Sequence, residues 1–282
     1  MRIAVSVEST CDLSKELLNK YDIKVIAYTI SVKDKMFKDG EYTTEEVFRM
    51  VEEVGVLPKT TAINQFEYAE YFKNLLTEYD QVVHICLSSG LSSSCANAKL
   101  ASADFDKVYV VDSETLSTGI GLLAIYAREL ADQGFTGEQI KEKLDARKQK
   151  LQVSFVVERL DYLHKGGRCT GFQLLGANLL RIRPKILVKD GKMGQDSSVR
   201  YRGDMGKVMD KYAQDVFAKN PNPDLERVFI TCTSTTPEMR NALVNACEKM
   251  GFKHIHETYA GCTIGSHCGA HTMGLLFFTE KA

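Results

Sequence analysis

The segment HICLSSGLSSSCANA, residues 84–98, places five serines directly after an apolar run. Such serines can attack a substrate, hold an anion with hydroxyl and backbone N–H groups, or cap a helix. A nucleophile elbow needs the pattern Gly-x-Ser-x-Gly. Here Gly90 is followed by Leu91, Ser92, Ser93 and Ser94, so the second glycine is missing. The signal for a hydrolase is weak, while a helix cap and an anion site at Ser92 and Ser93 both stay open.

A second pair of hydroxyls lies in LPKTTAIN, residues 57–64. Pro58 favours an extended entry into this segment, so that Thr60 and Thr61 can present their side chains. Asn64 can cap a following helix. Taken alone, this pattern is typical of a helix start.

The segment YAGCTIGSHCGAHTMG, residues 259–274, surrounds His267 and His271 with glycines. So many glycines indicate unusual backbone conformations or a close approach to another group. Two histidines four residues apart could bind a metal, but no neighbouring carboxylate or third ligand completes a zinc site. We therefore expect no metal. A histidine that donates to a carboxylate needs fewer partners.

The segment LDYLHKGGRCTG, residues 160–171, contains a basic turn at 165–168 that ends in Arg168. This turn could hold an anion, contact a partner protein, or be an ordinary solvated loop. Further basic residues follow it: Arg181, Arg183, Arg200 and Arg202. A local basic surface is therefore plausible on a chain whose formal net charge is only −1. That charge argues against nucleic acid as a partner.

The segment STGIGLLA, residues 117–124, imitates part of a dinucleotide-binding fingerprint. In the true motif the first glycine follows the strand at once, whereas here the letters DSETLST intervene. A nucleotide or phosphate binder is thus a weaker alternative.

The elements that must position these residues alternate between strands and helices. RIAVSV, QVVHICLSS and KVYVVDSE read as buried strands, and KVIAYTISV with KMFKDGEYT reads as a hairpin. Helices are expected after the first strand, with Ser9 or Asp12 as its cap, at TTEEVFRMVEE, at SCANAKLASADF and at STGIGLLAIYARELADQG. This order predicts an α/β fold with a doubly wound parallel sheet in residues 1–150.

The alternation of predicted strands and helices changes near residue 150. VSFVVERLDYL, RPKILVKDGKM, RVFITCTS and GLLFFTE read as strands, with helices expected at GDMGKVMDKYAQDVFAK and PEMRNALVNACEKMG. Asp190 and Gly191 between apolar flanks predict a hairpin. A second α/β domain with a mixed or antiparallel sheet is expected over residues 151–282, in direct contact with the first.

Composition limits the class of protein. The 282 residues, 44% of them hydrophobic, are enough for two domains with a sizeable core. The eight cysteines are scattered without a CxxC pair, which favours reduced thiols. No signal peptide and no membrane-spanning run are recognisable, so we expect a cytoplasmic protein without stable membrane insertion.

Taken together and in this order, several segments resemble the DegV family of bacterial fatty-acid-binding proteins. They are VSVESTCDLS, LPKTT, SSGLSSS, VDSETLSTGIG, LDYLHKGGR, IRPKIL and GCTIGSHCGAHTMG, which span nearly the whole chain. The resemblance implies a two-domain α/β carrier without a cofactor, holding a long-chain fatty acid between the domains. It also implies a partner, a separate fatty acid kinase that phosphorylates the bound carboxylate for phospholipid synthesis.

The resemblance also assigns roles to residues. It implies that Thr60, Ser92 and His267 hold the carboxylate, with Thr61, Ser93 and His271 as further candidates beside them. Arg168 and Arg200 match positions on the partner-facing surface of the family. The family usually has His-x-Gly-Pro-Gly where this chain has His267, Cys268, Gly269, Ala270 and His271.

Two hypotheses from other classes stay open on residue type. One is an acyl hydrolase or transferase that uses Ser92 and His267, and the other is the nucleotide or phosphate binder. The expected function is a non-enzymatic carrier, because a carboxylate removed from water needs several donors, which two hydroxyl turns and a histidine can supply.

Overall fold

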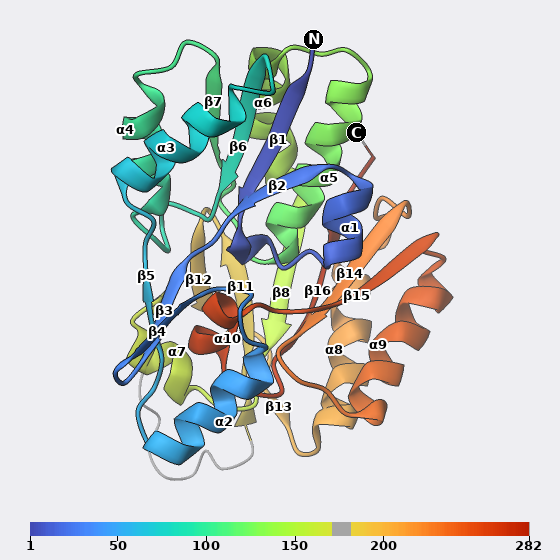
Figure 1. The fold of residues 1–282 in the computed structure, drawn as a ribbon. Helices are drawn as coiled ribbons and strands as arrows, with labels where there is room; N and C mark the ends of the chain where they lie inside the picture. The colour runs from blue at the N-terminus through green and yellow to red at the C-terminus, as the bar shows by residue number, and fades with distance from the viewer. Residues whose placement is uncertain (171–181, 282) are drawn as a thin grey trace.

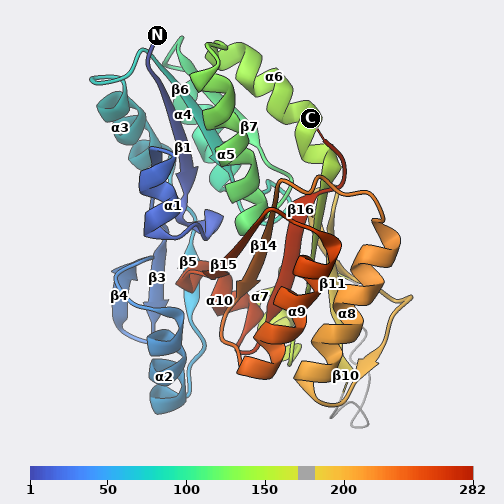
Figure 2. The same ribbon diagram turned by 90° about the vertical axis from the view of Figure 1, so that its right-hand side faces the viewer.

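A computed structural model gives the arrangement of residues 1–170 and 182–281. The first sheet has the strand order β2-β1-β6-β7, and all its neighbouring strands are parallel. Its strands are β1 (Ile3–Glu8), β2 (Ile23–Ile26), β6 (Gln81–Cys86) and β7 (Val108–Asp112). Every residue of β1 is buried, because helices cover both faces of the sheet. Figure 2 shows one layer of helices on each side of these strands.

Those helices begin at the caps that their sequences offer. They are α1 (Lys15–Lys20), α3 (Gln65–Leu75), α4 (Ser94–Ser102), α5 (Thr118–Asp132) and α6 (Gly137–Arg147). Asn64 caps α3 in a full capping box with Glu67, as its residue type predicts. The expected cap of the first helix is wrong: Ser9 lies in the short 3-10 helix η1 (Ser9–Cys11), and Ser14 caps α1.

A small antiparallel sheet extends below the first one. It has the order β4-β3-β5 and consists of β3 (Thr29–Val32), β4 (Lys35–Lys38) and β5 (Lys59–Thr61). The hairpin predicted around residues 24–43 is therefore present as β3 and β4, while β2 belongs to the parallel sheet. Helix α2 (Thr44–Val54) covers this small sheet and starts with the predicted capping box at Thr43.

The second large sheet is mixed and has the order β15-β14-β16-β8-β11-β12-β9. Its strands are β8 (Leu151–Val156), β9 (Cys169–Thr170), β11 (Lys185–Lys189), β12 (Lys192–Gln195), β14 (Arg227–Cys232), β15 (His254–Tyr259) and β16 (Met273–Phe278). Positive φ angles at Asp190 and Gly191 make the tight turn between β11 and β12. A separate pair joins β10 (Ile182–Arg183) and β13 (Tyr201–Arg202).

The two faces of this mixed sheet pack against different partners. Leu275 and Phe277 point towards the helices α8 (Met205–Lys219) and α9 (Pro237–Met250). Leu276 and Phe278, which alternate with them on β16, join the hydrophobic core of the parallel sheet. The molecule thus has an α/β fold, whose chain path is shown in Figure 1. One core cluster spans the parallel sheet and the inner face of the mixed sheet.

Two short helices were not expected from the sequence. The predicted strand at VSFVVERLDYL ends at Val156, and residues after it form α7 (Asp161–Gly166). The glycine-rich segment expected to be a loop contains α10 (Cys262–Cys268). All strands of the mixed sheet follow residue 150, but a division into two domains there stays a prediction because the core crosses it.

Candidate ligand-binding site

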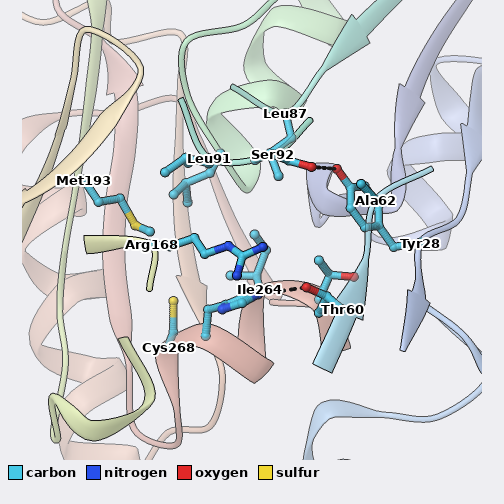
Figure 3. Close-up of a pocket in the computed structure, with 13 residues that line it drawn as sticks. Tyr28, Thr60, Ala62, Leu87, Leu91, Ser92, Arg168, Met193, Ile264 and Cys268 are labelled. Atoms are coloured by element: carbon cyan, nitrogen blue, oxygen red, sulfur yellow. Dashed lines mark hydrogen bonds between the residues drawn. The ribbon is translucent and has the colours of Figure 1, made fainter. Parts of the chain in front are cut away.

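A pocket lies where α10, α7 and the small sheet meet the turns that follow the parallel strands (Figure 3). Its polar lining brings together Thr60 of β5, Ser92 of the turn before α4, and His267 of α10. Tyr28, in the link between β2 and β3, also lines it. The remaining lining residues are Ala62, Leu87, Leu91, Leu116, Arg168, Met193, Thr263, Ile264 and Cys268. Three segments picked out from the sequence therefore converge on one pocket.

Thr60 and His267 are in direct contact. The Thr60 Oγ1 lies 2.9 Å from the His267 Nε2. Burial and, to a smaller extent, the charge of Arg168 together lower the pKa of His267 to about 4. The imidazole is therefore neutral near pH 7 and can act as a hydrogen-bond donor or acceptor, not as a fixed cation.

The other ring nitrogen of His267 is enclosed. Its Nδ1 is buried and has no hydrogen-bond partner among residues 1–170 and 182–281. A Cβ added to Gly166 would lie only 2.5 Å from that nitrogen, so the backbone of α7 packs directly on the ring. Because a serine hydrolase needs a carboxylate at this nitrogen to orient the base, the arrangement does not match a catalytic triad.

Ser92 is held from within the protein. Its Oγ accepts hydrogen bonds from the Tyr28 hydroxyl at 3.1 Å and from the Ser94 N–H at 3.2 Å. Figure 3 shows Ser92 beside Tyr28 and, below them in this view, Thr60. The site therefore offers hydroxyl and imidazole groups to the same space.

Helix α10 owes its position to carboxylates from the other end of the chain. Asp39 accepts from the N–H groups of Cys262 and Thr263, at 2.8 and 3.2 Å. Asp12 accepts from the Gly261 N–H at 2.8 Å. These bonds satisfy N–H groups at the start of the helix, which otherwise lack partners. Local sequence patterns give no sign of these contacts, because the partners are more than 200 residues apart.

An apolar cavity continues from the pocket. It shares Leu116, Ile264 and Cys268 with the pocket and extends between the parallel sheet and the inner face of β8 and β16. Its other lining residues are Ser117, Val153, Phe155, Thr231, Cys232, Thr233, Ala260, Thr272, Gly274 and Leu276. The two cavities have volumes of about 40 and 30 Å³, enough for only a few waters. A long ligand would have to displace side chains along this path.

The other candidate residues lie outside the lining of the pocket. Thr61 is exposed on β5, and Ser93 is exposed at the start of α4, where its side chain makes no cap hydrogen bond. His271 has a positive φ of 53° and its Nδ1 lies 2.7 Å from the Glu158 Oε2. Arg200 is exposed just before β13. Among the additional arginines, Arg181 lies outside the described residues.

The glycines of the dinucleotide-like segment serve packing inside α5. A Cβ on Gly119 would come within 2.6 Å of the Thr115 Oγ1, and one on Gly121 within 2.6 Å of the Leu13 side chain. Thr118, at the first position of the helix, is buried and its hydroxyl lies 2.6 Å from the Thr231 hydroxyl. This helix start is covered by protein, which argues against a nucleotide at that position.

Three side chains of metal-ligating type lie together in the parallel sheet. They are Glu8, His84 and Cys86, whose ligand atoms all lie within 4.8 Å of one another. Glu8 already accepts from the Leu87 N–H at 2.8 Å and is in contact with two tyrosine hydroxyls. The group is therefore a hydrogen-bonded cluster in the core.

The sequence of this chain matches a known protein family. The model of the family described as "Uncharacterised protein, DegV family" matches residues 2–280. The chain belongs to the DegV family. Within it, a Thermotoga maritima protein named "Fatty acid-binding protein" is 35% identical over 200 residues, which cover 68% of this chain and 69% of that protein.

Solved structures of DegV proteins have the same fold. A DegV family protein from Thermus thermophilus, described by its fatty acid binding, is 26% identical, with a TM-score of 0.90 and 99% of each chain covered. A Thermotoga maritima protein, described as revealing fatty acid binding function, is 28% identical, with a TM-score of 0.84 and the same coverage. In the described part of this DegV chain, no helix is long and apolar enough to cross a membrane.

Proposed function

We propose that this protein is a non-enzymatic carrier that binds one long-chain fatty acid. The contact between Thr60 and His267, facing Ser92 across a pocket with an apolar extension, is the observation that carries this proposal. Family relatives described as fatty-acid-binding proteins support it.

The polar end of the pocket suits a carboxylate. The hydroxyls of Thr60 and Ser92 can donate hydrogen bonds that replace the hydration of the anion, with the Thr60 proton free for the ligand when the His267 Nε2–H donates to the Thr60 oxygen. Arg168 lines the same pocket and adds a positive charge beside it. Each hydrogen bond to the charged head group contributes about 1.5–3 kcal/mol.

The apolar cavity suits the tail. At about 0.8 kcal/mol per buried methylene, a sixteen-carbon chain supplies roughly 11 kcal/mol before ordering costs are subtracted. Leu116, Ile264 and Cys268 connect the head-group pocket to the cavity, so the tail would pass between them. The cost of moving these side chains is small compared with the burial of the tail.

The geometry favours holding the ligand over attacking it. The His267 Nε2 contacts Thr60, and the Ser92 Oγ contacts Tyr28 and Ser94, so no base is paired with the serine. A nucleophilic serine needs such a base within hydrogen-bond reach. We therefore propose that Ser92 binds the carboxylate without reacting with it.

The carrier would present its ligand to a separate fatty acid kinase. Arg168 both lines the pocket and is exposed at its mouth, and Arg200 is exposed before β13. Two exposed guanidinium groups fit an acidic surface on such a partner. Pull-down with the kinase, comparing Arg168→Ala and Arg200→Ala with the exposed control Arg159→Ala, tests this part of the proposal.

Extraction of the purified protein followed by mass spectrometry tests the central proposal. We expect about one fatty acid per chain, reduced retention in Ser92→Ala, and unchanged retention in the neighbouring control Ser93→Ala. An empty protein that also fails to take up added palmitate or oleate would disprove it. Turnover of a p-nitrophenyl acyl ester that is lost in Ser92→Ala would instead support a hydrolase.

A further inference from the structure

A buried chain of hydrogen bonds lies directly behind Ser92. Glu8, the last residue of β1, is fully buried and accepts at Oε2 from the Leu87 N–H at 2.8 Å. The Tyr28 hydroxyl lies 3.3 Å from that oxygen and 3.1 Å from the Ser92 Oγ. The other carboxyl oxygen contacts the Tyr68 hydroxyl. Tyr28 therefore connects a core carboxyl group to the head-group pocket.

In the part of the chain that the structure describes, the groups that face Glu8 include no cation to pair with it. They are Tyr28, Tyr68, His84 and Cys86, with the hydroxyls of Thr10 and Ser94 beside them. Burial lowers the pKa of His84 to about 3, so this histidine is neutral. Burial also raises the pKa of Glu8, against the hydrogen bonds from Tyr68 and Leu87. An uncompensated buried carboxylate is costly, which favours the protonated acid.

The hydrogen-bonding positions of the Ser92 hydroxyl determine where its proton can point. A serine hydroxyl has one donor and two acceptor positions. Ser94 donates its N–H to the Ser92 Oγ, and Tyr28 donates its O–H to the same atom. With both acceptor positions filled, the Ser92 proton points away from these two groups, and the pocket is the space that remains.

The Tyr28 hydroxyl can donate its one proton in either of two directions. Tyr28 has one proton and two acceptors within reach, Glu8 and Ser92. An ionised Glu8 would attract this proton, and Ser92 would then donate to the Tyr28 oxygen instead of to a ligand. A neutral Glu8, which keeps its own proton and accepts from Leu87, competes less for the Tyr28 proton and leaves it to Ser92.

We propose that Glu8 is a positioning residue that acts through Tyr28 to direct the Ser92 hydroxyl proton towards an anionic head group. This inference rests on the proposed function, because it concerns the same pocket. It gives Glu8 and Tyr28 a role in ligand binding, in addition to the roles proposed for Thr60, Ser92 and His267. The carboxyl group of Glu8 does not touch the ligand.

Palmitate affinity at pH 7 in a set of variants tests the inference. Glu8→Gln imitates the neutral acid in size and in its ability to donate and accept, so its affinity should stay within about twofold of the wild type. Glu8→Leu removes the contacts of this carboxyl group with the Tyr28 hydroxyl and the Leu87 N–H, so Tyr28 is no longer held beside Ser92, and the variant should bind at least about tenfold more weakly. Tyr28→Phe should also weaken binding by about tenfold. Melting curves identify any variant that has lost its fold.

The double variant Tyr28→Phe/Ser92→Ala separates positioning from direct contact. If Tyr28 acts only through Ser92, this variant should bind within about twofold of Ser92→Ala alone. Additive losses, or a folded Glu8→Gln that binds as weakly as Tyr28→Phe, would overturn the inference. Failure of the wild type to bind palmitate would contradict the proposed function instead, so the two failures are distinguishable.

Discussion

Thr60 and His267 are 207 residues apart in the sequence, yet the Thr60 Oγ1 lies 2.9 Å from the His267 Nε2. Thr60 is fixed by the pairing of β5 with β3, where it lies opposite Ile30. His267 is fixed because Asp39 and Asp12 bind the start of α10. The amino-terminal half of the chain therefore positions both sides of this contact.

Removing the Thr60 hydroxyl should weaken ligand binding. Thr60→Val keeps the shape of the side chain but deletes a donor to the carboxylate, so palmitate affinity should fall by about 1.5–3 kcal/mol. Thr61→Val is the matched control, because Thr61 is exposed and does not line the pocket. Isothermal titration calorimetry measures both. Equal losses in the two variants would show that the head group is bound elsewhere.

Some parts of this structure could be predicted from local sequence signals. Local signals predicted the helix starts at Asn64 and Thr43 and the turn at Asp190 and Gly191, because caps and tight turns depend on neighbouring residues. The resemblance to a family names Thr60 for the carboxylate and keeps Thr61 as a further candidate, and of the two only Thr60 lines the pocket.

Contacts between distant segments could not be predicted from the sequence. Glu8 and Tyr28 carry no local motif, and their importance depends on β1 and the β2–β3 link meeting the turn after β6. The short helix α10 was expected to be a glycine loop, because the carboxylate of Asp39 that stabilises its start comes from a remote hairpin.

A methyl group at Gly166 should disturb the pocket. Its Cβ would lie 2.5 Å from the His267 Nδ1, so Gly166→Ala should displace the imidazole and cost about 1–3 kcal/mol of stability through overpacking. Palmitate affinity should fall with it. Gly194→Ala is the control, because nothing lies within 4 Å of the added carbon there. Thermal unfolding and calorimetry of both variants check this, and a wild-type-like Gly166→Ala would contradict the close packing.

A larger side chain at the junction of the two cavities should shorten the preferred ligand. Leu116 lines both cavities, so Leu116→Phe should exclude part of the tail and cost about 0.8 kcal/mol per excluded methylene. Palmitate should lose more affinity than octanoate. Leu100→Phe makes the same change at an exposed position and should leave both affinities unchanged. Equal losses for the two acids in Leu116→Phe would indicate a tail path elsewhere.

His84 should make the protein less stable in acid. Its pKa is about 3 in the folded protein and about 6.5 when unfolded, so the unfolded chain binds more protons between these values. Unfolding free energy should therefore decrease as pH falls below 6.5, with about 2 kcal/mol lost from this residue by pH 5. Denaturant titrations should show a smaller loss in His84→Gln than in the wild type. The exposed control His254→Gln should keep the wild-type slope, and equal slopes in all three proteins would contradict the assignment.

Gly166 also links the pocket to the outer surface. Its backbone packs on the His267 ring, and its carbonyl accepts a hydrogen bond from the Arg168 Nη1 at 2.7 Å. The turn that carries the exposed Arg168 is thus the same turn that packs on the imidazole. Under the proposed function, a partner that draws Arg168 outwards would loosen the packing on His267, so that docking and release of the fatty acid would be coupled.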